Sequence, residues 1–292
     1  MRKIACLTLD VEEDFLDPAG RIRLLEDPAL LDRYVAIIAT RGVKVAAFLV
    51  TSLLDKYGPA CRRLAERIPL EFAIHSHEHD MHDPSSPADI QKAVRAFRTF
   101  TGADPIGYRA PGGQIRHPGL QTLMDLGFRY DSSIYPSWRP GSPWGYNNLN
   151  LPITPFVLRS GPKSILEIPF ASLPTIRLNF SLSYVKMFGW NAYRLLLKLF
   201  PLPDQVSILS HPYDHYFHLL GDHGAAPETP LLKRNARSAF ELLEKMLDHL
   251  IAAGYEFEFM SSLCDELDPA SLPIFPLDSI LTPRFADLPQ AG

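Results

Sequence analysis

The chain has 292 residues, 46% of them hydrophobic and 21% charged, which is typical of a soluble globular protein with room for one large α/β domain or two small ones. A net charge of -4 without a long basic run gives no electrostatic basis for nucleic-acid binding. The three cysteines, Cys6, Cys61 and Cys264, form no CxxC pair, so they predict a reducing compartment and no disulfide framework.

The N-terminal residues predict neither a secretory signal nor a membrane span. Asp10 interrupts the apolar stretch after Met1-Arg2-Lys3 too early for a signal sequence. No segment reaches about 18 consecutive apolar residues. We therefore expect a cytoplasmic protein without a transmembrane segment. Residues 184–200 combine aromatic, leucine and cationic side chains, which suits either core packing or peripheral contact with a membrane surface.

Short apolar segments alternate with helical patterns along most of the chain. Strands are predicted over 4–10, 43–50, 70–74, 106–109 and 128–131, and helices over 28–41, 52–67, 87–101 and 118–126. Later strands are predicted over 164–169, 206–210 and 255–260, with a helix over 231–252. This alternation is typical of βα units around a parallel sheet.

Two segments depart from this alternation. Residues 136–163 are rich in Pro, Gly, Trp and Asn, and predict a long functional loop inserted in the domain. Residues 266–292 are Pro-rich and predict a C-terminal tail. The sequence thus predicts one domain over 1–265 followed by this tail.

Chemically reactive residues stand where the predicted strands end. Asp10, His75, Arg109, Asp131 and His211 each close a strand or follow it directly. Loops at the carboxyl ends of the strands of a (β/α) barrel meet on one face, where active sites lie. The pattern therefore favours a barrel with a catalytic face.

The histidines are concentrated after the predicted strand 70–74. Four of the ten lie within residues 75–82, interleaved with acids. Neutral imidazole is the commonest metal ligand in proteins, so the cluster indicates a metal site. A solvated loop rich in histidine is the alternative.

Five segments in order resemble the motifs of the polysaccharide deacetylase family, the NodB-homology or carbohydrate esterase 4 fold. They are Thr8-Leu9-Asp10-Val11-Glu12, His75 to His79, Arg109-Ala110-Pro111-Gly112, Tyr130-Asp131-Ser132-Ser133 and Leu209-Ser210-His211-Pro212. The resemblance covers about residues 4 to 264. It implies an α/β fold, a distorted barrel of about seven βα units. The implied activity is metal-dependent removal of an N-acyl group from an amino sugar, with acetyl as the preferred acyl group.

The resemblance implies a metal site made of Glu12, His75 and His79. The common family form has two adjacent aspartates in the first motif, whereas Val11 here cannot ligate. Asp10 then becomes the general base and Glu12 the third ligand, with Glu13 and Asp14 as alternatives. Two histidines and one carboxylate suit a divalent metal, zinc before cobalt, manganese or nickel. The spacing of four would bring both imidazoles to one face of a helical turn.

The other motifs imply the remaining roles. His211 matches the general acid, and Arg109 would hold Asp10 ionised and oriented. Asp131 could tune His211 in the same way. A purely structural role is the alternative for both Arg109 and Asp131. The implied substrate contacts are the N–H of Gly112, for the oxyanion, and Leu209, which lines the acyl pocket. Two further residues could contact the sugar, Glu167 in a buried strand and Trp138 in the long loop, with structural roles as the alternatives.

Several functions stay open at this point. The preferred substrate is an N-acylated saccharide, in a polysaccharide or in a nucleotide- or lipid-linked precursor. A hydrolase of cyclic amides or ureides, similar to allantoinase, and a metal-free carbohydrate-binding relative share the fold. His75-Ser76-His77-Glu78-His79 also matches the H-x-x-E-H signature of inverted zinc proteases, with Glu78 as the base.

Overall fold

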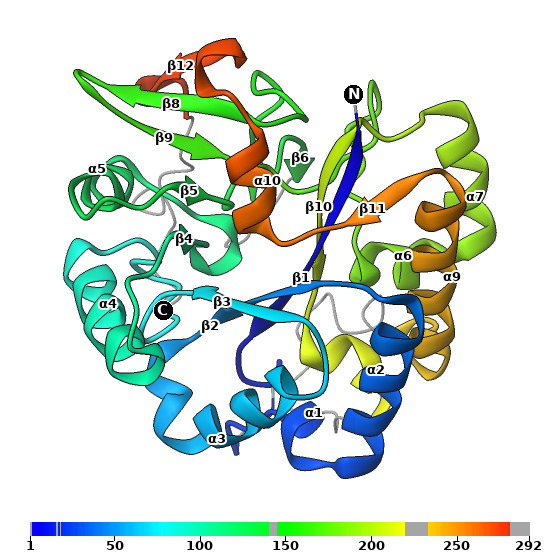
Figure 1. Ribbon diagram of the computed structural model, residues 1–292. Helices are drawn as coiled ribbons and strands as arrows, with labels where there is room; N and C mark the ends of the chain where they lie inside the picture. The colour runs from blue at the N-terminus through cyan, green and yellow to red at the C-terminus, as the bar shows by residue number, and fades with distance from the viewer. Residues whose placement is uncertain (1, 16, 18, 140–144, 220–232, 281–292) are drawn as a thin grey trace, which may run out of the picture.

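Parallel strands form a ring at the centre of the molecule (Figure 1). The structure is a computed structural model that describes residues 2–15, 17, 19–139, 145–219 and 233–280. The ring strands follow the order β10-β1-β2-β3-β4-β5-β9, and each neighbouring pair is parallel. A parallel bridge between Phe170 and Ser207 links the chain after β9 to β10 and closes the ring. The predicted α/β fold with a distorted barrel is confirmed.

The barrel strands differ widely in length. Their bounds are β1 (Lys3–Val11), β2 (Val45–Leu49), β3 (Leu70–Ile74), β4 (Gly107–Tyr108), β5 (Tyr130–Asp131), β9 (Lys163–Glu167) and β10 (Gln205–Ser210). Strands outside the ring are β6 (Trp138–Arg139), β7 (Tyr146–Asn147), β8 (Phe156–Ser160), β11 (Tyr255–Phe257) and β12 (Ile274–Pro276). Of these, β8 is antiparallel to β9, whereas β11 pairs in parallel with the start of β1.

Helices surround the barrel (Figure 1). The α-helices are α1 (Arg23–Glu26), α2 (Pro28–Arg41), α3 (Leu54–Ala65), α4 (Pro87–Thr101), α5 (His117–Asp125), α6 (Leu182–Phe188), α7 (Trp190–Leu199), α9 (Ala239–Ala252) and α10 (Met260–Glu266). The 3-10 helices are η1 (Thr51–Leu53), η2 (Pro111–Gly113), η3 (Pro212–His215), η4 (Phe217–Leu219), η5 (Ala236–Ser238), η6 (Pro269–Ser271) and η7 (Leu277–Ser279). Among the described residues, no helix combines the length and the hydropathy needed to cross a membrane.

Local signals explain why α2 begins and ends where it does. The Asp27 side chain accepts hydrogen bonds from the N–H groups of Ala29 and Leu30, and Pro28 occupies the first helical position. Gly42 ends the helix in the left-handed conformation, with φ of 61°. The predicted bounds 28–41 therefore agree with the structure to the residue.

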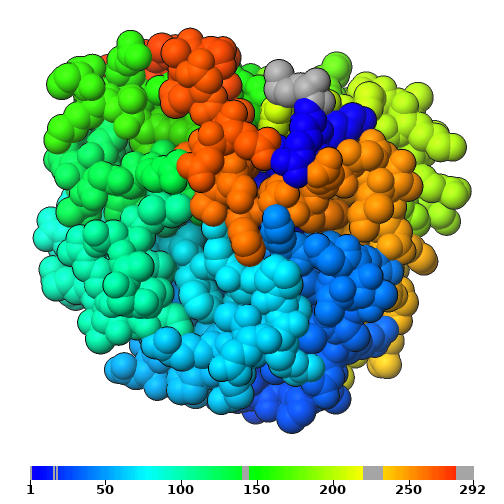
Figure 2. All heavy atoms as spheres, in the orientation of Figure 1, coloured from blue at the N-terminus to red at the C-terminus, as the bar shows by residue number. Residues whose placement is uncertain are grey.

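The barrel interior changes character along its axis. Towards the start of the strands it is apolar, with Ile4 and Cys6 packed against Met260 and Leu263 of α10. Figure 2 shows α10, in orange, lying across this face of the molecule. Alternate residues of a strand share one side, so the interior side of β1 continues from Cys6 to Asp10. Reactive groups therefore collect at the opposite end of the barrel from α10.

The part of the chain after residue 135 differs from the prediction in four places. The predicted loop 136–163 contains the strand β8, whose short apolar segment lies among Pro-rich sequence and is therefore not predicted as a strand. The strand expected over 255–260 ends at Phe257, because Met260 and Leu263 are buried on one face of α10 instead. Residues 274–276, in the segment predicted as a tail, form β12 beside β8. Within the helix predicted over 231–252, the structure has η5 over Ala236–Ser238 and α9 over Ala239–Ala252, while residues 231 and 232 lie outside the described residues.

Candidate active site at the carboxyl ends of the barrel strands

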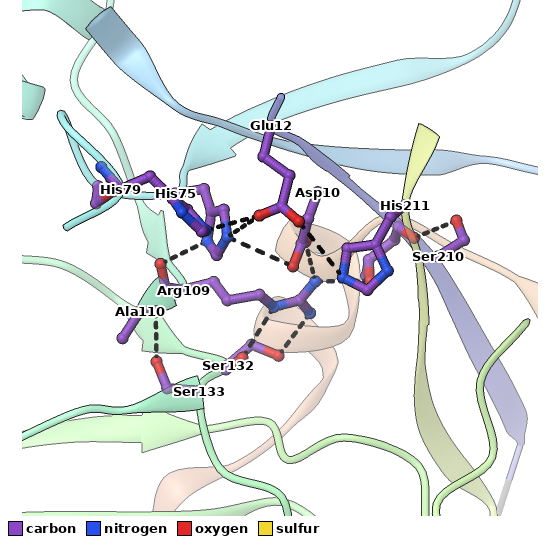
Figure 3. A network of polar contacts seen from close by, with 12 residues as sticks. Asp10, Glu12, His75, His79, Arg109, Ala110, Ser132, Ser133, Ser210 and His211 are labelled. Atoms are coloured by element: carbon purple, nitrogen blue, oxygen red, sulfur yellow. Dashed lines mark hydrogen bonds and ion pairs between the residues drawn. The ribbon is translucent and has the colours of Figure 1, made fainter. Parts of the chain in front are cut away.

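Four of the five reactive residues predicted from the strand ends lie close together in one polar network (Figure 3). Asp10 lies near the end of β1, and His75, Arg109 and His211 directly follow β3, β4 and β10. Asp10, His75 and Arg109 are buried. The parallel strands thus bring together residues that are up to 201 positions apart.

Glu12, His75 and His79 form a compact group whose ligand atoms all lie within 4.8 Å of one another. Glu12 Oε2 lies 3.2 Å from His75 Nε2 and 2.7 Å from His79 Nε2. Glu12 Oε1 accepts a hydrogen bond of 3.1 Å from the Tyr213 hydroxyl. Burial opposes ionisation of Glu12, but the two histidines outweigh it and hold its pKa well below the usual range.

The two histidines are brought together by an irregular loop, so the predicted helical turn is wrong. Ser76 and His79 have left-handed φ angles of 64° and 54°. The His79 N–H donates to Ser76 Oγ at 3.0 Å, which stabilises this turn. His75 Nδ1 lies 2.9 Å from the carbonyl oxygen of Arg109, which leaves Nε2 free to face the site.

The loop geometry also argues against the zinc-protease interpretation. That signature needs both histidines on a helix, with the glutamate beside the metal. The side chain of Glu78 is 55% exposed and lies 3.3 Å from His77 Nε2. The loop is held from outside by Asp89 of α4, which accepts hydrogen bonds from the N–H groups of His77 and Glu78. Glu78 thus stands outside the polar network.

The trio suits a divalent cation. His79 Nε2 is buried, and no described group completes a hydrogen bond with it, although Glu12 Oε2 is near. Two imidazole nitrogens and a carboxylate oxygen that converge in a buried site are a donor set typical of zinc. The alternative third ligands point elsewhere, since Glu13 is exposed and Asp14 accepts from the Tyr216 hydroxyl at 2.5 Å.

Arg109 holds Asp10 from the interior of the barrel. Its Nη1 donates to Asp10 Oδ1 at 2.5 Å, and its guanidinium is completely buried. The rings of Phe48 and Phe170 lie 3.9 and 4.5 Å from the guanidinium carbon. Asp10 Oδ2 lies 3.7 Å from His75 Nε2. One carboxylate oxygen is therefore fixed, and the other faces the predicted metal ligands.

His211 lies across the site from His75 and His79 (Figure 3). Its Nδ1 is 3.2 Å from Asp214 Oδ2, and its Nε2 is 3.9 Å from Glu12 Oε1. Burial lowers the pKa of His211, but these two carboxylates outweigh burial and raise it to about 9. The partner of His211 is therefore Asp214 and not Asp131, which corrects the role predicted for Asp131.

Asp214 belongs to a buried charge network that the sequence prediction missed. Lys186 Nζ of α6 donates to Asp214 Oδ1 at 2.9 Å, and Ser183 donates to both carboxylate oxygens. Both charged side chains are almost fully buried. Burial opposes the charge of Asp214, but Lys186 and His211 hold its pKa well below the usual range. The acid three residues after His211 was the available signal in the sequence.

Asp131 and Glu167 form a second acidic pair, as neighbours across β5 and β9. Asp131 Oδ1 accepts from the Ser133 hydroxyl at 2.7 Å, and Glu167 Oε1 accepts from the N–H of Ile134 at 2.9 Å. Burial raises the pKa of both acids, that of Asp131 to about 6. These contacts brace the loop after β5.

The three remaining predicted residues have different environments. Gly112 lies in η2 with φ of 59°, directly after the Arg109-Ala110-Pro111 segment. Leu209 is buried on β10, on the same side as Ser207, whose hydroxyl meets Arg109 Nη2 at 3.4 Å. Trp138, on β6, is 60% exposed and free to contact a large ligand.

Comparison with protein families agrees with the fold and the motifs. Residues 5–130 match the sequence model of the family described as polysaccharide deacetylase. This segment contains Asp10, Glu12, His75, His79 and Arg109. Residues 5–130 thus resemble a polysaccharide deacetylase domain, and the match spans 126 of the 292 residues.

Individual proteins resemble the chain in part. A peptidoglycan deacetylase-like protein, FGM2 of Gibberella zeae, is 35% identical over 68 residues, which are 22% of this chain and 20% of that protein. A Mycobacterium smegmatis protein assigned as a polysaccharide deacetylase has a TM-score of 0.58 at 18% identity, over 94% of this chain and 93% of its own. PuuE allantoinase has a TM-score of 0.58 at 12% identity, over 90% and 89% of the two chains. The Mycobacterium smegmatis protein and PuuE allantoinase therefore share the fold of this chain.

Proposed function

We propose that the protein is a divalent-metal-dependent hydrolase that removes an N-acyl group, acetyl in the first place, from an amino sugar. The observation that carries this proposal is the arrangement of one buried site. Glu12, His75 and His79 form a donor set, with Asp10 beside them and His211 on the other side. Amide hydrolysis needs an activated nucleophile and a proton donor for the amine, and this site offers both.

Each residue has a role that follows from its contacts. Glu12, His75 and His79 would hold the metal, which when bound supplies Lewis-acid polarisation and a more acidic water. Asp10, oriented by Arg109, takes the proton of the attacking water. His211, whose pKa is raised to about 9 by Asp214 and Glu12, donates its proton to the departing amine. The Gly112 N–H is the proposed oxyanion donor, and Leu209 the wall of the acyl pocket.

The direct test is release of acetate or formate from chitooligosaccharides and other N-acyl amino sugars by zinc-loaded protein. We expect wild type to release the acyl group, and Asp10→Asn to be about 10²- to 10⁴-fold slower. Glu78→Gln is the matched control and should retain the wild-type rate. Absence of acyl release from every sugar tested would contradict the proposal.

A cyclic ureide is the second candidate substrate, because PuuE allantoinase has a similar fold over 90% of this chain. The same zinc-loaded protein should therefore be assayed on allantoin. Turnover of allantoin without acyl release from sugars would replace the first proposal by the second. A metal-free carbohydrate-binding role would be supported instead if the protein bound chitooligosaccharides but neither metal nor allantoin.

We also propose peripheral contact with an anionic membrane, which would suit a lipid-linked saccharide. Leu195 and Leu199 on α7 are 60% and 62% exposed, and Arg194 and Lys198 are exposed beside them. A cytoplasmic location is supported by the three free cysteines. Sedimentation with vesicles containing phosphatidylserine should be lost in Leu195→Asp. Equal sedimentation of wild type and variant would contradict membrane contact.

A further inference from the structure

Tyr135 lies in the loop after β5, inside a row of stacked groups that begins at Arg109. One face of its ring stacks on Phe170, with ring centroids 3.9 Å apart and an interplanar angle of 17°. The other face stacks on Tyr146, at 5.1 Å and 12°. Phe170 in turn lies 4.5 Å from the Arg109 guanidinium carbon. Tyr135 is therefore tied by packing to the arginine that orients Asp10.

The edge of the Tyr135 ring rests on the turn that contains the proposed oxyanion donor. Gly113 has φ of +68°, and a Cβ at this position would lie 2.5 Å from Tyr135 Cε2 and 2.6 Å from the Ser133 carbonyl oxygen. Only glycine allows this close approach and this backbone conformation. The ring is thus held one residue away from Gly112.

The hydroxyl is the part of Tyr135 that this packing leaves available. The backbone carbonyl of Tyr135 accepts from Asn148 Nδ2 at 3.0 Å, whereas within the described ranges the phenol oxygen has no hydrogen-bond partner. The side chain is half-buried. A half-buried donor at an otherwise packed position can bind a polar group of a ligand without breaking a bond inside the protein.

Electrostatic coupling agrees with this position. Burial, then the nearby Tyr146 and Asp10, raise the pKa of Tyr135 well above 10. Tyr135 also contributes to the raised pKa of Tyr213, whose hydroxyl binds Glu12. The Tyr135 phenol is therefore neutral at physiological pH and lies within reach of the charges of the site.

We propose that the Tyr135 hydroxyl is a substrate-binding donor that holds a hydroxyl or ring oxygen of the sugar beside the scissile N-acyl group. This inference rests on the proposed deacetylase function. It gives Tyr135 a role in recognising the ground state, since the possible metal ligands are Glu12, His75 and His79. The interaction contributes to binding of substrate more than to the chemical step.

The test is Tyr135→Phe, which keeps the stacked ring and removes only the hydroxyl. With zinc-loaded protein and N-acetyl chitooligosaccharides, we expect KM to rise about threefold to tenfold with kcat within about twofold. Tyr255→Phe is the matched control. The Tyr255 hydroxyl binds the carbonyls of Leu202 and Pro203 where β11 meets the start of β1, so its loss should leave both constants unchanged.

Binding of the same oligosaccharide, measured by calorimetry, separates the two proposals. If wild type binds the sugar without hydrolysing it, the deacetylase function fails, and a weaker Kd in Tyr135→Phe still supports the binding role. Unchanged KM and Kd in Tyr135→Phe, beside an active wild type, would overturn the inference alone. A fall in kcat at constant KM would also overturn it, because the hydroxyl would then act in the transition state.

Discussion

The Glu12 side and the His211 side of the site compensate buried charge in different ways. On the side of Glu12, the carboxylate faces two imidazoles, and among the described residues the structure gives it no lysine or arginine. On the side of His211, the carboxylate of Asp214 is neutralised by the buried ammonium of Lys186. The first side is suited to receive a cation from solution, whereas the second carries a fixed cation of its own. Buried charges need such compensation in both cases.

The largest expected effect removes the proposed ligand on the first side. Glu12→Gln keeps the shape of the side chain but loses the charge that compensates the metal. We expect loss of bound zinc, measured by mass spectrometry of the metal, and a fall of about 10³-fold in acyl release. Glu13→Gln is the matched control, since Glu13 is exposed, and should keep both metal and activity. Full zinc occupancy in Glu12→Gln would contradict the difference drawn between the two sides.

The second prediction separates the roles of the two sides by leaving group. His211→Asn should slow release of acetate from an amino sugar about 10²-fold, because an amine leaves poorly without a proton. An aryl acetate with a good leaving group needs no such donor, so its hydrolysis should change less than threefold. Zinc content should stay at the wild-type level. An equal loss on both substrates would show that His211 acts on the metal side instead.

The third prediction concerns the fixed cation. Lys186→Met leaves Asp214 charged in a buried site, so the free energy of unfolding should fall by about 3–5 kcal/mol in urea titrations. Lys198→Met, at an exposed position of α7, should change it by less than about 0.5 kcal/mol. Adding Asp214→Asn to Lys186→Met should restore part of the loss. No recovery would indicate that packing of the lysine chain, and not its charge, stabilises this side.

The smallest effect depends on pH. His215 is buried between Tyr34 and Phe240, and burial lowers its pKa to about 3. The unfolded chain takes up a proton near pH 6.5, whereas the folded chain does not until about pH 3. Stability from this group is therefore present above pH 6.5 and is lost as pH falls towards 3.

His215→Phe tests this assignment. The variant should unfold with a shallower loss of stability between pH 6 and 4, by up to about 1.4 kcal/mol per pH unit relative to wild type. Its stability at pH 7 should stay close to that of wild type, because no described group bonds to either ring nitrogen. Parallel pH profiles of the two proteins would mean that His215 is protonated in the folded state.

The sequence predicted those parts of the molecule that local rules determine. The capping residues of α2 determine where the helix begins and ends. The parallel direction of β1, β3 and β4 places Asp10, His75 and Arg109 at the same end of the barrel, independently of the loop conformations. The position of His79 depends on two left-handed residues in an irregular loop, which no spacing rule predicts. The partnership of Asp214 with Lys186 joins residues 28 positions apart through the packing of α6. Likewise, the sequence does not show the distance between the loops after β5 and β10, so it cannot distinguish Asp131 from Asp214 as the partner of His211.

Titration of metal-free wild-type protein with zinc, followed by acetate release from an N-acetyl chitooligosaccharide, tests the central claim most directly. We expect no release without metal, then a rise that levels off at one zinc ion per chain, with bound zinc following the same curve. Full activity in the metal-free protein, or stoichiometric zinc binding with no acetate release from any N-acyl sugar, would contradict it.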